Sequence, residues 1–108
     1  MEHFSVKVTG AFEQDLAIAY GYYQTQAGPQ SANRFLDEYD LTVERLSVMP
    51  SAAVKLAQTG YLWCPIGSFT AVFSIDDDNH IVYLLRLFYM SSNWKHRILE
   101  EGDIGQMG

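Results

Sequence analysis

The sequence predicts a single α+β domain in which a helical hairpin packs on a small, mostly antiparallel sheet. Its 108 residues fit one core and leave too little chain for two. Apolar types make up 48% of the chain and charged types 19%, which is enough apolar surface to bury a core. The hydrophobic period changes along the chain from that of a strand to that of a helix and back, which gives the order β-α-α-β-β-β.

The first strand and the first helix are predicted from a change of period. Residues 4–8 alternate apolar and polar types and are rich in β-branched residues, as in a short strand that ends at Thr9-Gly10. A helix of about four turns follows. Its apolar stripe consists of Phe12, Leu16, Ala19, Tyr20 and Tyr23. Tyr22 lies off this stripe.

A second helix begins after the break at Gly28-Pro29. Proline is tolerated in the first turn of a helix, so Gly28 or Ser31 is expected near the cap. Met49-Pro50 ends the helix. Two amphipathic helices with a short link form a hairpin. The stripe of the second helix consists of Ala32, Phe35, Leu36, Tyr39, Val43 and Leu46.

Three strands are predicted in the second half. The pattern at 51–59 is weak, and both a turn of helix and an ordered loop remain open. Residues 61–64 read as a strand closed by Pro65 and Gly67. Residues 69–75 alternate and present one apolar face.

The last strand is apolar on both faces. Residues 81–89 are all apolar or aromatic except Arg86, which is typical of a central strand or of one covered by another chain. An uncovered face of this kind could also pair with a second copy in a homodimer. Residues 91–99 are expected to form a short helix or an ordered tail, and 100–108 to be frayed, all within one domain over 1–108.

Several classes of protein are disfavoured by composition. No apolar run reaches the roughly 18 residues that a membrane span needs, and Met1 to Thr9 does not resemble a secretory signal. Cys64 is the single cysteine, so no internal disulfide or cysteine zinc cage is expected, and it reads as a small buried core residue. We expect a cytoplasmic protein with neither membrane partner nor cofactor.

Charge is divided unevenly along the chain. The formal net charge is −6. Between Ala11 and Arg45 there are six acids and two bases, whereas between Leu84 and Leu99 there are three bases and no acid. A basic partner should therefore approach the helical hairpin, and an anionic partner the C-terminal part.

Arg86 is the most informative residue. A guanidinium within an apolar strand must be paired or must face a cleft, because burying it unpaired costs several kcal/mol. It therefore either binds an anionic group or pairs with a helix acid, for which Asp15, Asp37 and Asp40 are candidates.

Two other polar motifs are candidate sites. His96 lies between Lys95 and Arg97, and these cations favour the neutral imidazole that a general base requires, although three solvated residues on a C-terminal turn remain the simpler interpretation. The run 76–80, Asp-Asp-Asp-Asn-His, lacks the alternate spacing, glycine and distant glutamate of a calcium loop and is predicted to be a hairpin turn. No metal site is expected.

The order of elements and five short motifs resemble the RelE/ParE superfamily of bacterial toxins, the plasmid-stabilisation proteins. The likeness runs from about Val6 to Leu99. The C-terminal segment Asn93-Trp94-Lys95-His96 is similar to the corresponding segment of many members. The motifs are 12–16 (FEQDL), 32–36 (ANRFL), 46–50 (LSVMP), 69–76 (FTAVFSID) and 81–89 (IVYLLRLFY).

The resemblance implies the toxin of a type II toxin-antitoxin pair, with a RelE/ParE-like fold, held inactive by a cognate antitoxin. Some members cut mRNA in the ribosomal A site, and others act on DNA gyrase. The basic positions of the mRNA-cutting branch correspond here to Thr70 and to Ser91-Ser92, whereas the last-strand arginine of the gyrase branch matches Arg86. Loss of such a cation strongly lowers the rate of RNA cleavage, because it no longer stabilises the charge that develops on the phosphate.

The resemblance therefore favours a ParE-like toxin that binds its target. An mRNA endonuclease, with Arg86, His96 and Tyr89 as candidate catalytic residues, and an inactive partner-binding module are the alternatives. The contact surface for target or antitoxin is expected to comprise Arg86, Ser91, Ser92, Asn93, Trp94, Lys95 and Arg97. The antitoxin is also expected to lay a basic amphipathic helix along the acidic hairpin.

Overall fold

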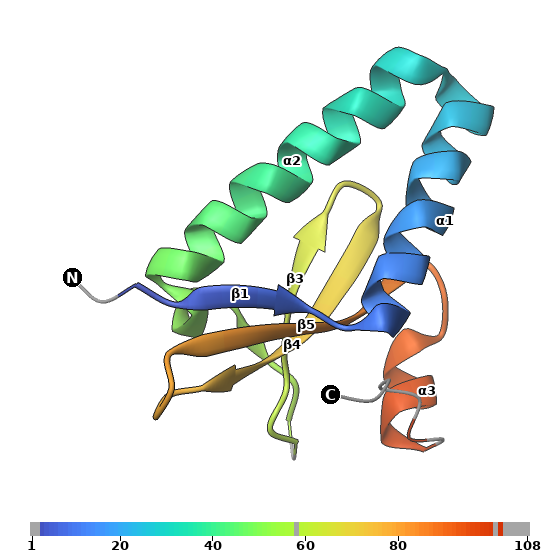
Figure 1. Ribbon diagram of the computed structural model, residues 1–108. Helices are drawn as coiled ribbons and strands as arrows, with labels where there is room; N and C mark the ends of the chain where they lie inside the picture. Colours follow the sequence, from blue (N-terminus) through green and yellow to red (C-terminus); the bar gives the residue numbers. More distant parts are fainter. Residues whose placement is uncertain (1–2, 58, 101, 103–108) are drawn as a thin grey trace.

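The computed structural model describes residues 3–57, 59–100 and Gly102. Two long helices lean together above a twisted sheet, and a short C-terminal helix lies beyond it (Figure 1). In chain order the elements are β1 (Ser5–Val8), α1 (Gly10–Ala27), α2 (Pro29–Val48), the 3-10 turn η1 (Pro50–Ala52), β2 (Val54–Lys55), β3 (Leu62–Ile66), β4 (Phe69–Asp76), β5 (Ile81–Tyr89) and α3 (Trp94–Leu99).

The sheet confirms the predicted α+β class. Its strand order is β1-β5-β4-β3-β2, with β1 parallel to β5 and the other neighbours antiparallel. β5 lies between β1 and β4, so it is paired on both edges, as its apolar sequence predicted.

The sheet has a core on each face. On one face, the stripes of α1 and α2 pack on β4 and β5 through residues such as Phe12, Phe35, Phe73 and Leu84. On the other face, α3 packs on the sheet. That second core consists of Leu56, Val72, Phe88, Trp94 and Ile98.

Two local signals position the hairpin. The Thr9 hydroxyl accepts a hydrogen bond from the Phe12 amide at 3.1 Å, which caps α1, and donates to the Leu85 carbonyl at 3.0 Å. Gly28 has φ of 90°, a left-handed conformation that favours glycine, and it joins the end of α1 to Pro29 at the start of α2.

The structure corrects the predicted end of the third strand. Pro65 lies within β3 and pairs with Thr70, rather than closing the strand. β2 pairs only with Leu62 and Trp63, so β3 has no neighbour on that side at Pro65, and a proline is tolerated there. The open segment 51–59 forms η1 and the two-residue strand β2.

A bulge interrupts β5. Val72 pairs with Arg86 but Phe73 pairs with Leu84, so Leu85 is an extra residue in the ladder. The bulge exchanges the two faces of the strand, because Leu84 and Leu87 both reach the hairpin core although three positions apart. The side chains of Arg86 and Phe88 are thereby placed toward the face that carries α3.

The C-terminal segment is helical over 94–99, and most of the predicted frayed tail at 100–108 falls outside the described residues. Within the described ranges no helix is long and apolar enough to cross a membrane. The same residues contain no cluster of three His, Cys, Asp or Glu side chains able to hold a metal ion.

Candidate functional site

Arg86 forms an ion pair with Asp15, the first of the three acids that the sequence allowed. Its Nε lies 2.7 Å from Asp15 Oδ2 and its Nη2 3.3 Å from Oδ1, and the same carboxylate accepts the Leu87 amide at 2.9 Å. The two side chains are only 15% and 12% exposed. Asp15 thus links α1 to the edge of β5 just past the end of β1.

Cations and aromatic rings alternate around α3. The guanidinium carbons of Arg86 and Arg97 lie 4.7 and 5.0 Å from the centre of the Phe88 ring. The Lys95 ammonium lies 5.4 Å from the Trp63 ring and 5.5 Å from the Trp94 ring. These contacts hold positive charge against flat apolar surfaces. We call this surface the cationic face: Arg86, Lys95 and Arg97 with Trp63, Phe88 and Trp94.

Tyr89 belongs to a different surface. Its hydroxyl lies 3.4 Å from that of Tyr22, and its ring packs edge-on against Tyr22 and Phe69 on the hairpin side of the sheet. The hydrogen bond with Tyr89, followed by burial, raises the pKa of Tyr22 above its usual value. Tyr22, which lay off the helix stripe, is therefore the partner of Tyr89, and only its misfit to the stripe hinted at this.

The remaining predicted residues are divided between a turn and α3. Ser92 closes the turn after β5, where its amide and hydroxyl both donate to the Tyr89 carbonyl. Ser91, His96 and Lys95 are exposed, and Asn93 precedes the first turn of α3 without a side-chain cap. Thr70 is fully buried in β4 and, among the described residues, its hydroxyl has no hydrogen-bond partner.

The structure therefore does not gather the three candidate catalytic residues on one face. Arg86 contacts Phe88, which stacks on Trp94 of α3. Tyr89 contacts Tyr22 of α1 on the opposite side. Arg86, Trp94, Lys95 and Arg97, by contrast, do share the cationic face.

The hairpin carries an apolar groove on its outer side. The groove is an open hollow of about 450 Å³ between α1 and α2, lined by Glu13, Leu16, Ala17, Tyr20 and Leu36. Ile18 and Leu41 are 69% and 57% exposed on the same two helices. Apolar side chains left in water at this level often mark an interaction surface.

Comparisons with known proteins identify the family. A sequence profile described as ParE toxin of type II toxin-antitoxin system, parDE, matches residues 6–94. None of the curated protein sequences is similar enough to this chain to count as a match.

Solved structures share the fold. A chain of the chromosomal ParDE toxin-antitoxin system from P. aeruginosa is 22% identical, with a TM-score of 0.68, over 82% of this chain and 98% of that one. A chain of the RelBE2 toxin-antitoxin complex from Mycobacterium tuberculosis is 20% identical, with a TM-score of 0.59, over 81% and 98%. A mutant of the E. coli toxin RelE in the free state is 8% identical, with a TM-score of 0.61, over 95% and 99%.

The profile covers most of the chain, from β1 to the first residue of α3, and the fold of the structural neighbours agrees with it. This chain therefore belongs to the ParE toxin family and is the toxin of a type II toxin-antitoxin system.

Proposed function

We propose that this toxin acts in the cytoplasm by binding a cellular target through its cationic face, not by cutting RNA. The observation that carries the proposal is the state of two candidate catalytic groups: the Arg86 guanidinium is already paired with the Asp15 carboxylate, and Tyr89 packs against Tyr22 on the other face of the strand. Cleavage needs a base and a phosphate-binding cation within reach of the same phosphodiester.

The cationic face suits a target that is acidic or rich in phosphate. Lys95 is exposed beside two indole rings, and tryptophan and arginine are the residues that most often dominate binding energy at interfaces. DNA gyrase, on which members of the gyrase branch of the superfamily act, is the first target to test. Ser91, Ser92 and Asn93 border this face and would supply its polar rim.

The partner that neutralises the toxin would be a cognate antitoxin with a basic amphipathic helix. The groove lined by Leu16, Ala17, Tyr20 and Leu36 offers apolar contact, and Glu13 lies at its border. The hairpin region carries six acids against two bases, so a basic helix would be attracted to it.

Growth of a bacterial host on induction tests the target surface. Wild-type chain should arrest growth, and Lys95→Ala should weaken the arrest at equal protein level, because it removes an exposed cation and replaces no buried side chain. Lys55→Ala is the matched control, since Lys55 is exposed on β2 at the far edge of the sheet. Equal toxicity of the two variants would count against the cationic face.

Two cell-free assays separate the modes of action. Inhibition of gyrase supercoiling without fragmentation of mRNA on translating ribosomes supports the proposal. Fragmentation that is lost in His96→Ala or Arg86→Ala would establish the endonuclease instead. Neither activity, together with normal growth, would leave an inactive partner-binding module.

Relief of growth arrest tests the antitoxin surface. Co-expression of the neighbouring open reading frame should rescue growth with the wild-type chain but not with Ala17→Asp, which places a charge on an exposed residue that lines the groove. Val54→Asp is the control, because Val54 is 51% exposed on β2, away from the groove. Rescue of Ala17→Asp as complete as that of Val54→Asp would contradict the placement of the antitoxin helix in the groove.

A further inference from the structure

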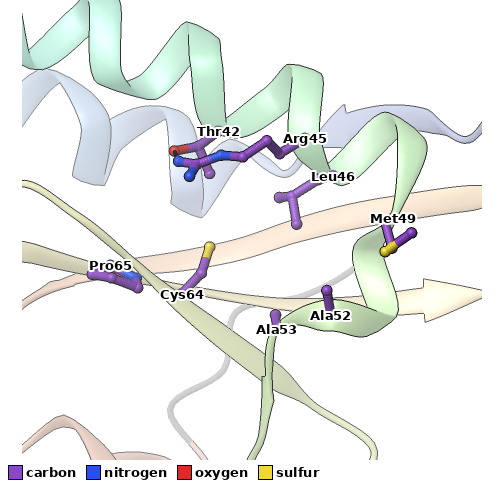
Figure 2. A pocket seen from close by; sticks show the side chains of 8 residues that line it. All are labelled: Thr42, Arg45, Leu46, Met49, Ala52, Ala53, Cys64 and Pro65. Carbon is purple, nitrogen blue, oxygen red and sulfur yellow. Dashed lines mark hydrogen bonds between the residues drawn. The ribbon is translucent and has the colours of Figure 1, made fainter.

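A second hollow lies under the C-terminal end of α2, outside both surfaces described above. It has a volume of about 220 Å³ and opens between α2, η1 and β3 (Figure 2). Its walls are mainly apolar, and three polar side chains enter it. The lining residues are Thr42, Arg45, Leu46, Met49, Ala52, Ala53, Cys64 and Pro65.

Arg45, an exposed residue of α2, is the charged group that lines this open cavity. Its Nη2 donates to the Thr42 hydroxyl at 3.2 Å, and that hydroxyl donates to the Glu38 carbonyl at 2.8 Å. No acid lies three or four positions away on the helix, where Leu41, Thr42, Val48 and Met49 stand instead. In the described part of the chain no carboxylate pairs with Arg45, so most of its donors are available to an anion.

Cys64 forms part of the floor. Figure 2 shows its sulfur pointing toward α2 and the region of Leu46 and Arg45. Burial raises the pKa of this thiol to about 11, although the Arg45 charge acts in the opposite direction. The thiol is therefore neutral at physiological pH and does not compete as an anion for Arg45.

The neighbouring sheet edge does not suit an added strand. The Tyr61 carbonyl accepts from the Leu56 amide, so Tyr61, Trp63 and, by alternation, Pro65 turn their backbone groups to that edge. Pro65 has no amide to donate, which blunts the edge. The cavity is thus suited to a compact group rather than to an extended backbone.

We propose that this cavity binds a carboxylate attached to a small apolar body. The carboxylate would accept from Arg45, and the apolar body would lie among Leu46, Met49 and Ala53. A cavity of about 150 Å³ accommodates benzene, so the space here holds a ring or branched alkyl group with its carboxylate. The proposal does not depend on how the toxin acts, because the cavity lies apart from the cationic face and the hairpin groove.

NMR titration of the intact chain with benzoate tests the proposal, with benzamide as the uncharged probe of equal shape. Benzoate should shift the amide resonances of Thr42, Leu46 and Cys64, and benzamide should bind several-fold more weakly, because its carbonyl can still accept from Arg45 but it has no negative charge to pair with the guanidinium. Arg45→Gln should reduce benzoate affinity by a similar factor. Arg34→Gln is the matched control, since Arg34 is exposed on the same helix but lines none of this cavity.

The single cysteine supplies an independent readout. Saturating benzoate should slow alkylation of Cys64 by iodoacetamide at pH 9 several-fold in the wild-type chain and in Arg34→Gln, because the ligand covers the sulfur and neutralises Arg45. Arg45→Gln should show no such protection. Because this readout reports one residue, nonspecific binding elsewhere does not affect it.

A third titration identifies the source of the carboxylate. A tetrapeptide ending in leucine with a free carboxyl group is compared with benzoate and with its amide-capped form. Tighter binding of the free-acid peptide assigns the cavity to a protein C-terminus, and equal or tighter binding of benzoate assigns it to a small organic acid. Failure of both probes to bind, or equal affinity for benzoate and benzamide, would overturn the proposal.

Discussion

The Asp15 carboxylate satisfies several donors at one uncovered edge. It accepts from Arg86 twice and from the Leu87 amide, at the position where β1 no longer pairs with β5. Both charges are largely withdrawn from water, so removal of one leaves the other without its counter-charge. The pair therefore fixes α1 against the sheet, and Arg86 contributes to the cationic face mainly by shape and local charge against Phe88.

Asp15→Asn should lower the free energy of unfolding by about 2–3 kcal/mol, measured by urea denaturation. The double variant Asp15→Asn with Arg86→Met should recover much of that loss, because no charge is left unpaired and a side-chain oxygen remains to accept from the Leu87 amide. Asp37→Asn, at an exposed site of α2, is the control and should change stability by less than about 0.5 kcal/mol. An Asp15→Asn variant as stable as this control would show that the pair contributes nothing net.

Cys64 should be slow to react although it lines an open cavity. Burial raises its pKa from the ordinary 9.0 to about 11, so at pH 8 about a hundredfold less thiolate is present than at a free cysteine. Its reaction with a disulfide reagent should be slow in the native chain and normal in urea. Since the folded state holds the thiol proton more tightly than the unfolded state does, this group should also reduce stability as the pH rises from about 9 to about 11.

At the level of elements, α3 depends on the sheet beneath it. A helix of six residues is too short to persist alone in water, and its contacts come from Trp94 and Ile98 against Phe88, Val72 and Leu56. Trp94→Ala should therefore release α3 while the hairpin core stays folded, with a stability loss of about 3 kcal/mol or more. Hydrogen exchange should show protection lost in 94–99 but kept in β4, whereas Leu99→Ala, at an exposed position, should leave both protected.

Loss of protection throughout the chain in Trp94→Ala would contradict the prediction that the hairpin core stays folded without α3. Loss restricted to α3 should be accompanied by weaker growth arrest, because Lys95 and Arg97 would no longer be held over the rings of Trp63 and Phe88. Trp94→Ala keeps Lys95 and Arg97 in the sequence but removes the helix that holds them in place. It therefore tests whether toxicity depends on the position of these two cations.

The elements also show what a sequence can and cannot predict. The strong periods of the two hairpin helices and of 69–75 and 81–89 predicted elements close to α1, α2, β4 and β5, because burial on a defined face dictates residue type. The two-residue strand β2 left no pattern, since so short a segment has no period. The bulge at Leu85 was not predicted either, and it decides which face of the sheet Arg86 and Phe88 take relative to Leu84.

The candidate site was predictable only in part for the same reason. An arginine within an apolar strand predicted either a bound anionic group or an ion pair with a helix acid, but the choice of Asp15 over Asp37 or Asp40 depends on where α1 crosses β5, which no local pattern encodes. Lys95 and Arg97 were expected on a contact surface from charge alone. Their contacts with the rings of Trp63 and Phe88 depend on the tertiary arrangement and could not be predicted from the sequence.

Across the whole molecule, charge is sorted between two surfaces. The hairpin holds six acids against two bases, and the face around α3 gathers Arg86, Lys95 and Arg97, although the chain carries −6 overall. Fields of opposite sign on two sides of one small domain favour partners of opposite charge, so a basic antitoxin helix and an acidic target need not compete for the same residues.

The association rate with the antitoxin should therefore depend on salt through the hairpin acids. Asp37 and Asp40 are exposed on α2, and opposite fields steer encounter more than they strengthen the final complex. Raising the ionic strength from low to high salt should slow association of the wild-type toxin about tenfold, measured by stopped-flow, with little change in the dissociation rate. Asp37→Asn with Asp40→Asn should flatten that dependence. Asp77→Asn with Asp78→Asn, an equal loss of charge in the exposed β4–β5 turn, should leave it nearly intact, and an identical flattening in the two double variants would mean that net charge, not its placement on the hairpin, guides the antitoxin.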